Sequence, residues 1–186
     1  MKILGLDSSG IVASVAIVED ENLIAEYTVN YKKTHSQTLL PMLDELVKMT
    51  ELDLDTIDAI AVAAGPGSFT GLRIGSATAK GLGLALKKPL VEIPTVDALA
   101  YNLYDSRALI CPIMDARRSQ VYTGIYRFQE HKLVTVEAQM AVPMAEMIEK
   151  LNARGEEVVF LGDGVPVFGK MIQENLKVHI LLPLPM

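Results

Sequence analysis

The chain has 186 residues, and half of them are hydrophobic. This length allows one domain or two small lobes with a buried core. The formal net charge is −6, and no run of basic residues is longer than two. Tight RNA binding usually needs clustered Lys and Arg, so the composition argues against tight RNA binding by this chain alone.

The single cysteine and the N-terminal segment narrow the class of protein further. Cys111 excludes an internal disulfide and a zinc site built from cysteines. It stands in the apolar run Ala108–Met114, which favours a buried, inert thiol. The N-terminal MKILGLD reaches a charge at Asp7, too early for the apolar core of a signal peptide, and Arg, Lys or Pro interrupts the long apolar stretches. The sequence therefore predicts a cytoplasmic protein.

The first half of the chain predicts meandering strands followed by alternating helices and strands. Short polar turns such as Asp7-Ser8-Ser9-Gly10 separate the strands, and Thr34 or Ser36 is a candidate helix cap. Apolar residues then recur at helical spacing, and a glycine-rich segment opens a second helix. In chain order we expect strands at 2–7, 11–18 and 23–29, a helix at 36–50, a strand at 57–64, a helix at 69–86, a strand at 90–93 and a helix at 96–104.

The second half repeats this plan. We expect strands at 108–114 and 121–128, a helix at 144–152, a strand at 158–161 and a helix at 167–175. In both halves an aspartate-led turn follows the first strand, at Asp7 and Asp115, and Gly-x-Gly follows a later strand, at Gly65 and Gly162. A doubly wound sheet would alternate strand and helix from the start. Two similar α/β lobes, 1–105 and 106–186, are therefore expected.

The aspartate-led turns are candidate phosphate-binding loops. Such a turn can aim N–H groups and hydroxyls at a phosphate, and its aspartate can hold a metal-bound water. A plain turn is the alternative, but a second turn of the same kind favours phosphate binding, because two such turns can face one another across a cleft. The predicted nucleotide-binding residues are Asp7, Ser8, Ser9, Asp115, Gly162 and Gly164.

The segment Gly65–Gly75 is the most informative part of the sequence. It follows a buried strand and opens a helix, where free N–H groups lie at a positive helix end, but it matches neither the Walker A nor the G-x-G-x-x-G pattern. Along the helix that it opens, the small residues Gly71, Gly75, Ala79 and Gly83 recur every four positions, so one helix face allows very close packing. Burial inside the lobe is the alternative to a partner interface. The expected interface comprises Leu39, Leu43, Leu46, Gly71, Leu72, Gly75, Ala79, Leu82 and Gly83.

Residue types used in catalysis form no recognisable motif. His35, His131 and His179 lie far apart in the sequence and show no H-x-x-x-H or H-E-x-x-H spacing, and G-x-S-x-G is missing. Arg117-Arg118 can meet a phosphate, although a solvated turn accounts for the pair equally well. No catalytic or metal-binding residue is predicted.

Four segments, LGLDSS, THSQTLLP, AVAAGPGSFTGLRIG and ICPIMDARRSQVY, resemble the TsaB (YeaZ) family in sequence, order and spacing. The similarity extends over most of residues 1–182. It implies the two-lobe actin/Hsp70/sugar-kinase-like (ASKHA, ribonuclease H-like) α/β fold, built from duplicated βββαβα units.

The same resemblance implies a function as a non-catalytic partner and activator of TsaD. TsaD transfers threonylcarbamoyl to the adenosine next to the anticodon of certain tRNAs, and a TsaE-type ATPase joins the complex. The resemblance implies pairing through the helices near 36–50 and 69–86, homodimers formed through the same surface, and contact with tRNA only through the complex. The cofactor that it suggests is ATP or ADP with Mg²⁺ in the complex.

Two departures from family patterns matter. TsaD proteins carry an H-x-x-x-H metal pair after the equivalent helix and strand, whereas Ile93–Ala100 contains no histidine; a catalytic iron or zinc site is not expected there. The sequence also stops at 182–186, where family members usually continue into another helical segment, so the second lobe is either naturally short or truncated at this end. The alternatives are an ATP-dependent phosphotransferase or ATPase, with Asp7 or Asp115 positioning Mg²⁺, and a glycoprotease-like metallopeptidase.

Overall fold

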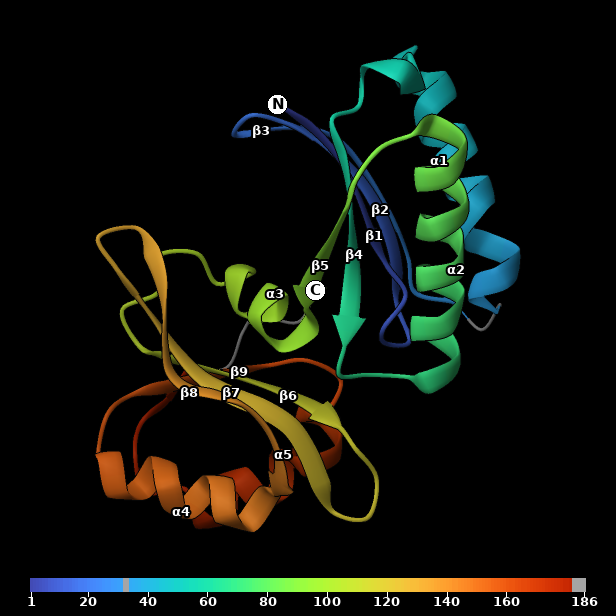
Figure 1. Ribbon diagram of the computed structural model, residues 1–186. Coiled ribbons are helices and arrows are strands. Elements are labelled where there is room, and N and C mark those ends of the chain that lie inside the picture. The colour runs from blue at the N-terminus through green and yellow to red at the C-terminus, as the bar shows by residue number, and fades with distance from the viewer. Residues whose placement is uncertain (32–33, 182–186) are drawn as a thin grey trace. The chain divides into compact units, whose positions relative to one another are not determined.

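The computed structural model describes residues 1–31 and 34–181 (Figure 1). The chain divides into two compact units, Met1–Thr95 and Val96–Met186. The expected boundary near Asp105 falls later in the sequence than this division, because Val96 and Ala100 belong to a core cluster of the second unit. The expected short C-terminus concerns residues 182–186, which lie outside the described ranges.

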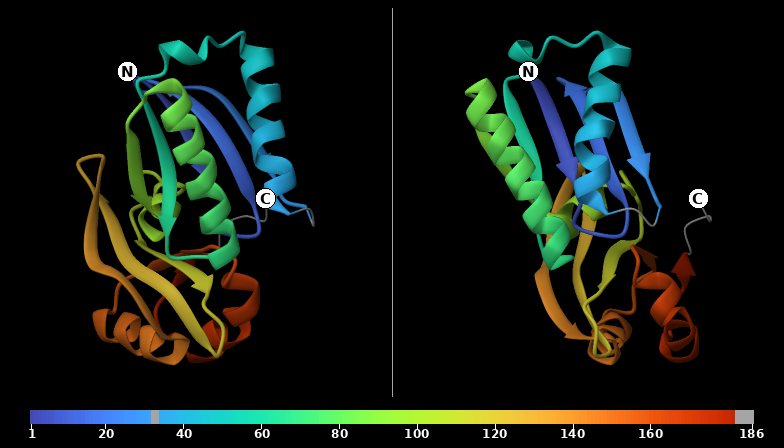
Figure 2. Two further views of the ribbon diagram at one scale, coloured as in Figure 1. Left: turned by 45° about the vertical axis from the view of Figure 1, so that its right-hand side comes forward. Right: turned by 90° about the vertical axis from the view of Figure 1, so that its right-hand side faces the viewer.

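The first unit is a mixed five-stranded sheet with two helices on one face (Figure 2). Its strand order is β3-β2-β1-β4-β5; β1 and β2, and β2 and β3, are antiparallel, whereas β4 runs parallel to β1 and to β5. The elements are β1 (Lys2–Asp7), β2 (Ala13–Glu19), β3 (Asn22–Val29), α1 (His35–Thr50), a 3₁₀ turn at Leu54–Thr56, β4 (Ala59–Gly65), α2 (Phe69–Leu86) and β5 (Leu90–Pro94).

Sequence pattern explains the packing of this unit. On β2 the buried residues alternate with half-buried ones, as expected for a strand with one face on the core. On α1 the buried residues are Leu39, Met42, Leu43 and Leu46, which recur at helical spacing. Both helices contribute to the same aliphatic core over the sheet. No helix in the described ranges is long and apolar enough to cross a membrane.

The second unit is also a five-stranded mixed sheet, in the order β10-β9-β6-β7-β8. Helices α4 and α5 share one hydrophobic core with the sheet, and α3 belongs to a second cluster with other residues of the same strands. The elements are α3 (Thr95–Tyr101), β6 (Leu109–Asp115), β7 (Gln120–Gln129), β8 (Lys132–Pro143), α4 (Met144–Arg154), β9 (Val158–Leu161), α5 (Val165–Asn175) and β10 (Ile180–Leu181).

The predicted duplication is confirmed. The first unit begins β1-β2-β3-α1-β4-α2, and the second contains β6-β7-β8-α4-β9-α5 in the same order. Strand β8, which completes the second copy, was not expected from the sequence. It is an edge strand whose residues are all partly or largely exposed, and its pairing register with β7 shifts, so its sequence shows no clean alternation of apolar and polar residues.

Candidate functional site

The loops at the carboxyl ends of the parallel strands are the first place to examine for ligand binding. In the first unit, β1 and β4 are parallel and end at Asp7 and Gly65. In the second unit, β6 and β9 are parallel and end at Asp115 and Leu161. The predicted nucleotide-binding residues therefore lie in or next to these loops, in each unit taken by itself.

In the first unit, the turn after β1 forms hydrogen bonds with the start of α2. Ser8 and Ser9 are each 2% exposed. The Ser8 hydroxyl donates to the Gly71 carbonyl at 2.9 Å, and the Ser9 carbonyl accepts from the Ser68 N–H at 2.6 Å. The Asp7 carboxylate accepts from the Ser9 N–H at 2.7 Å. These contacts fasten the turn to the start of α2, so nucleotide binding by Asp7, Ser8 and Ser9 stays a prediction.

The glycines of α2 allow this close approach. A Cβ atom on Gly75 would lie 2.6 Å from the Ser8 hydroxyl oxygen, and one on Gly71 would collide with the Ser8 carbonyl oxygen. Farther along the helix, a Cβ atom on Gly83 would lie 2.9 Å from Leu90. The smooth face of α2 therefore packs on the first unit's own sheet and turn.

This packing corrects the predicted partner interface. Gly71, Gly75, Ala79 and Gly83 are buried, as are Leu39, Leu43 and Leu46 of α1. Leu72 and Leu82 are only partly exposed, and Leu82 packs against the core. The simpler alternative, burial within one lobe, accounts for these positions, since Ser8 of the turn after β1 lies beside Gly71 and Gly75, and Leu90 of β5 lies beside Gly83.

The exposed surface of α2 lies on its opposite side. Phe69 is 73% exposed and Leu84 is 83% exposed, and Arg73 and Ala77 are exposed between them. The Arg73 guanidinium carbon lies 5.4 Å from the centre of the Phe69 ring. Positions 69, 73, 77, 80 and 84 recur every three or four residues, so they share one helix face; we call them the outer stripe of α2. The regular spacing of the glycines directed the sequence-based interface prediction to the packed face of α2 rather than to this exposed one.

A groove borders the outer stripe. Its volume is about 540 Å³, and its lining includes residues 62–64 of β4, Phe69 and Ala77 of α2, and Glu92 of β5. Apolar walls with a few charged groups at the margin are typical of surfaces that receive a side chain from a partner.

In the second unit, glycines again allow close packing beside a strand. The Gly164 N–H donates to the Ile113 carbonyl at 3.0 Å, and a Cβ atom on Gly162 would collide with that oxygen. The Asp115 N–H donates to the Asp163 carboxylate at 3.1 Å. Gly162 and Gly164 thus hold the loop after β9 against β6, and their binding of a nucleotide stays a prediction.

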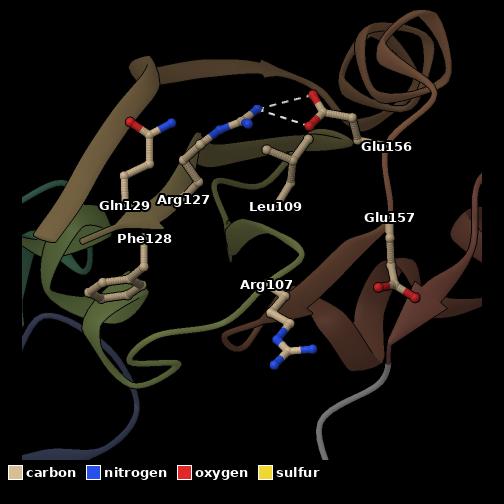
Figure 3. A pocket seen from close by; sticks show the side chains of 7 residues that line it. All are labelled: Arg107, Leu109, Arg127, Phe128, Gln129, Glu156 and Glu157. Carbon is tan, nitrogen blue, oxygen red and sulfur yellow. Dashed lines mark hydrogen bonds and ion pairs between the residues drawn. The ribbon is translucent and has the colours of Figure 1, made fainter. Parts of the chain in front are cut away.

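The pocket in Figure 3 lies at the other end of the second sheet, beside the amino ends of β6 and β9. Its volume is about 350 Å³. Arg127 forms two hydrogen bonds with the Glu156 carboxylate, at 3.1 and 3.0 Å, and Glu157 contacts His179 at 2.6 Å. Because most of its charged groups already have partners, this pocket is a weaker candidate than the loops at the carboxyl ends.

Groups able to hold a metal or act as a nucleophile are scattered. Within 1–31 and 34–181, no cluster of three His, Cys, Asp or Glu side chains could hold a metal ion. His35 contacts the Gly10 carbonyl at 2.8 Å, and His131 pairs with Asp105 at 2.8 Å. Cys111 is fully buried, and this burial raises the pKa of its thiol to about 12.

The duplicated βββαβα units place the chain in the actin/Hsp70/sugar-kinase-like fold class. The activator of the 2-hydroxyisocaproyl-CoA dehydratase from Clostridium difficile, solved with bound ADPNP, has a similar fold: the TM-score is 0.52 at 14% identity, over 98% of this chain and 88% of that one. At that identity the likeness concerns the fold alone.

Closer similarities define the family. Residues 22–183 match the family model described as TsaD, tRNA N6-adenosine threonylcarbamoyltransferase. The Bacillus subtilis tRNA threonylcarbamoyladenosine biosynthesis protein TsaB is 36% identical over 95% of this chain and 77% of its own length. YeaZ from Pseudomonas aeruginosa superimposes with a TM-score of 0.82 at 27% identity, over 98% of this chain and 84% of that one. The chain belongs to the TsaB (YeaZ) family of tRNA threonylcarbamoyladenosine biosynthesis proteins.

Proposed function

We propose that this chain is a non-catalytic partner subunit that binds a TsaD-type transferase and activates it for threonylcarbamoylation of the adenosine next to the anticodon. The observation that carries the proposal is the outer stripe of α2. A leucine that is 83% exposed and a phenylalanine that is 73% exposed stand on a helix whose other face is already packed. Exposed apolar side chains beside a groove support a protein partner.

The charges of α2 also support a partner. Arg73 and Lys80 are exposed and lie on the outer stripe, and residues 69–86 contain no acidic side chain. Apolar residues flanked by basic ones would complement a partner surface that is apolar with an acidic margin. Helix α1 of the same unit also carries exposed apolar side chains, Leu40 and Met49, which a partner could cover.

The side chains of the segment that follows β4 and α2 support a non-catalytic role. Transferases of this superfamily carry a histidine pair after the equivalent helix and strand, and 93–100 contains none. The polar groups present there hold the fold together. The Thr95 hydroxyl accepts from the Gly65 N–H at 3.2 Å, and the Asp97 carboxylate accepts from the Tyr126 hydroxyl at 2.6 Å.

The finer features of the proposal follow the family. A TsaE-type ATPase would join the complex, tRNA would be bound only by the assembly, and the isolated chain would form homodimers through the partner surface. Any ATP or ADP with Mg²⁺ would be held within the complex. The work of such a complex on tRNA supports a cytoplasmic location.

A reconstituted transfer reaction tests the proposal. The TsaD homologue of the same organism should incorporate threonylcarbamoyl into tRNA faster when this chain is added, whereas the chain alone should transfer none. The rival ATPase function requires Mg²⁺-dependent ATP hydrolysis by the isolated chain that is lost on Asp7→Ala. Hydrolysis with that dependence, and no effect on the transferase, would replace the proposal by the rival.

A further inference from the structure

The turn that joins β6 to β7 has an unusual backbone. Arg117, Arg118 and Ser119 have φ values of 68°, 52° and 58°, so three successive residues with side chains lie in the left-handed region. Residues other than glycine normally enter that region singly, because the Cβ atom then approaches the following carbonyl oxygen. Elsewhere in the described ranges, left-handed residues other than glycine occur singly or, at Glu130 and His131, as a pair.

Hydrogen bonds within the hairpin and from α4 hold this turn in place. The Ala116 N–H donates to the Gln120 carbonyl at 3.0 Å, and the Gln120 N–H donates back to the Arg117 carbonyl at 3.0 Å. The Ser119 carbonyl accepts from the N–H of Met144, the first residue of α4, at 3.1 Å. The backbone of the turn is therefore fixed both to its own hairpin and to the start of α4.

Stability alone does not account for the residues at these positions. Glycine or asparagine would adopt the left-handed conformation at lower cost. The sequence instead places two adjacent arginines there, although Lys outnumbers Arg by 11 to 6 in the chain. Strained backbone that the surrounding structure maintains is a pointer to function.

The two guanidinium groups differ in their pairing. Arg117 is 87% exposed and lies 3.3 Å from the Asp115 carboxylate. Arg118 is exposed, and no carboxylate in the part of the chain that the structure describes forms an ion pair with it. The turn thus presents two neighbouring guanidinium groups to solvent, one of them next to a carboxylate.

We infer that Arg117 and Arg118 form a docking point for the phosphate backbone of the tRNA in the assembled complex. The inference rests on the proposed function. The planar guanidinium fork matches the oxygens of a phosphate and can pair with two of them at once, and two neighbouring arginines suit two neighbouring phosphates of one strand. Because backbone contacts position an RNA without reading its bases, this turn orients the substrate and carries no chemistry.

The inference agrees with the charge of the chain. Two arginines on a protein of net charge −6 are too few for independent RNA binding, since affinity grows with the number of phosphates neutralised. The isolated chain is therefore expected to bind tRNA weakly, and the turn contributes only where other subunits supply most of the affinity.

The test measures tRNA binding by the complex of this chain with its TsaD homologue, using an unmodified transcript at several salt concentrations. The double variant R117Q/R118Q removes both charges from the turn. The control R107Q/K132Q removes the same charge from exposed sites elsewhere in the second unit. We expect the turn variant to bind about five- to fiftyfold more weakly and its logarithmic salt slope to fall by about 1 to 2, while the control stays near wild type.

Arg118→Gly separates recognition from folding. Glycine relieves the left-handed strain, so the unfolding midpoint of this variant should stay level or rise while tRNA binding weakens. Unchanged affinity and salt slope in an intact R117Q/R118Q complex would overturn the inference. Failure of R117Q/R118Q to assemble with the TsaD homologue would also overturn it, because the turn would then contact an acidic surface of the partner. A loss confined to ATP binding would overturn it too, because the turn would then bind a free nucleotide. If the wild-type chain does not assemble with the TsaD homologue, the proposed function fails first and the inference falls with it.

Discussion

Gly75 of α2 packs against Ser8: a Cβ atom on the glycine would come within 2.6 Å of the serine hydroxyl oxygen. That hydroxyl is 2.9 Å from the carbonyl oxygen of Gly71, one turn earlier on the same helix. The turn after β1 and the start of α2 are thus joined by a buried hydrogen bond that only a helix without side chains at these positions can accommodate. The glycine-rich start of α2 thus holds this helix against the turn after β1.

The first prediction concerns these glycines. Gly75→Ala should lower the free energy of unfolding by about 1–3 kcal/mol, because the methyl group displaces the Ser8 hydroxyl. Gly71→Ala should be the more damaging change, since its methyl group meets the Ser8 backbone. Urea unfolding followed by circular dichroism measures both effects.

Gly81→Ala is the matched control on the same helix. Gly81 is exposed, and a Cβ atom there would meet nothing within 4 Å. This change should stabilise the protein by up to about 1 kcal/mol, because alanine favours helix more than glycine does. Equal effects of Gly75→Ala and Gly81→Ala would contradict the close packing of Ser8 on α2.

The glycines of α2 also show which features of the fold could be predicted from the sequence. The spacing of Gly71, Gly75, Ala79 and Gly83 correctly predicted a face for very close packing, and the helix at Phe69–Leu86 was predicted with its observed ends. The sequence could not show whether a sheet or a second helix fills that space, because both require small residues. That choice depends on how β1 and β4 pair across more than 50 residues.

Other limits of prediction have similar causes. The aspartate-led turns at Asp7 and Asp115 and a second lobe that repeats the plan of the first were predictable from local pattern, whereas the full βββαβα order came from the family resemblance. Strand β8 was missed because an irregular edge strand lacks alternation, and the left-handed turn at Arg117–Ser119 was missed because its residues are not ones that favour this conformation. Backbone conformations imposed by long-range contacts leave little signal in the local sequence.

The second prediction concerns the link between α3 and β7. The Tyr126 hydroxyl donates to the Asp97 carboxylate at 2.6 Å, and burial raises the pKa of this tyrosine. Tyr126→Phe should cost about 1.5–3 kcal/mol, because it leaves a part-buried carboxylate without its donor. Tyr101→Phe, at a tyrosine that is 55% exposed, should change stability by less than about 0.5 kcal/mol. If thermal unfolding shows the two variants to be alike, the Asp97 contact is unimportant.

The third prediction concerns pH. Burial raises the pKa of the Cys111 thiol from 9.0 to about 12. As the pH rises above 9, the thiol of the unfolded chain loses its proton while that of the folded chain keeps it, so the folded state loses stability. The contribution of this group is at most about 1.4 kcal/mol per pH unit, and it ends near pH 12.

Cys111→Ala removes this titration. The variant starts from lower stability because it leaves a cavity, but its stability should fall less steeply than that of the wild type between pH 9 and 10.5. Denaturant unfolding at a series of pH values gives both slopes. Parallel curves, or rapid labelling of the native thiol by a maleimide at pH 7, would show that Cys111 is not shielded as described.

The fourth prediction concerns the outer stripe of α2. Leu84→Ser and Phe69→Ser should leave the unfolding free energy within about 0.5 kcal/mol of wild type, because both side chains are largely exposed. Each should weaken binding to the TsaD homologue by at least about 1 kcal/mol if it is central to the interface. Val167→Ser, at a 58% exposed apolar residue of α5, is the control, and calorimetric titration measures the affinities. Identical affinities for all three variants would place the partner elsewhere.

Size-exclusion chromatography with light scattering tests the central claim most directly, on the chain alone and mixed with the TsaD homologue of the same organism. The account predicts a homodimer that exchanges into a heterodimer containing one copy of each chain, and a Leu84→Ser chain that remains folded but forms less of it. A wild-type chain that stays a monomer and elutes apart from the TsaD homologue would contradict the partner-subunit function and favour the ATPase alternative.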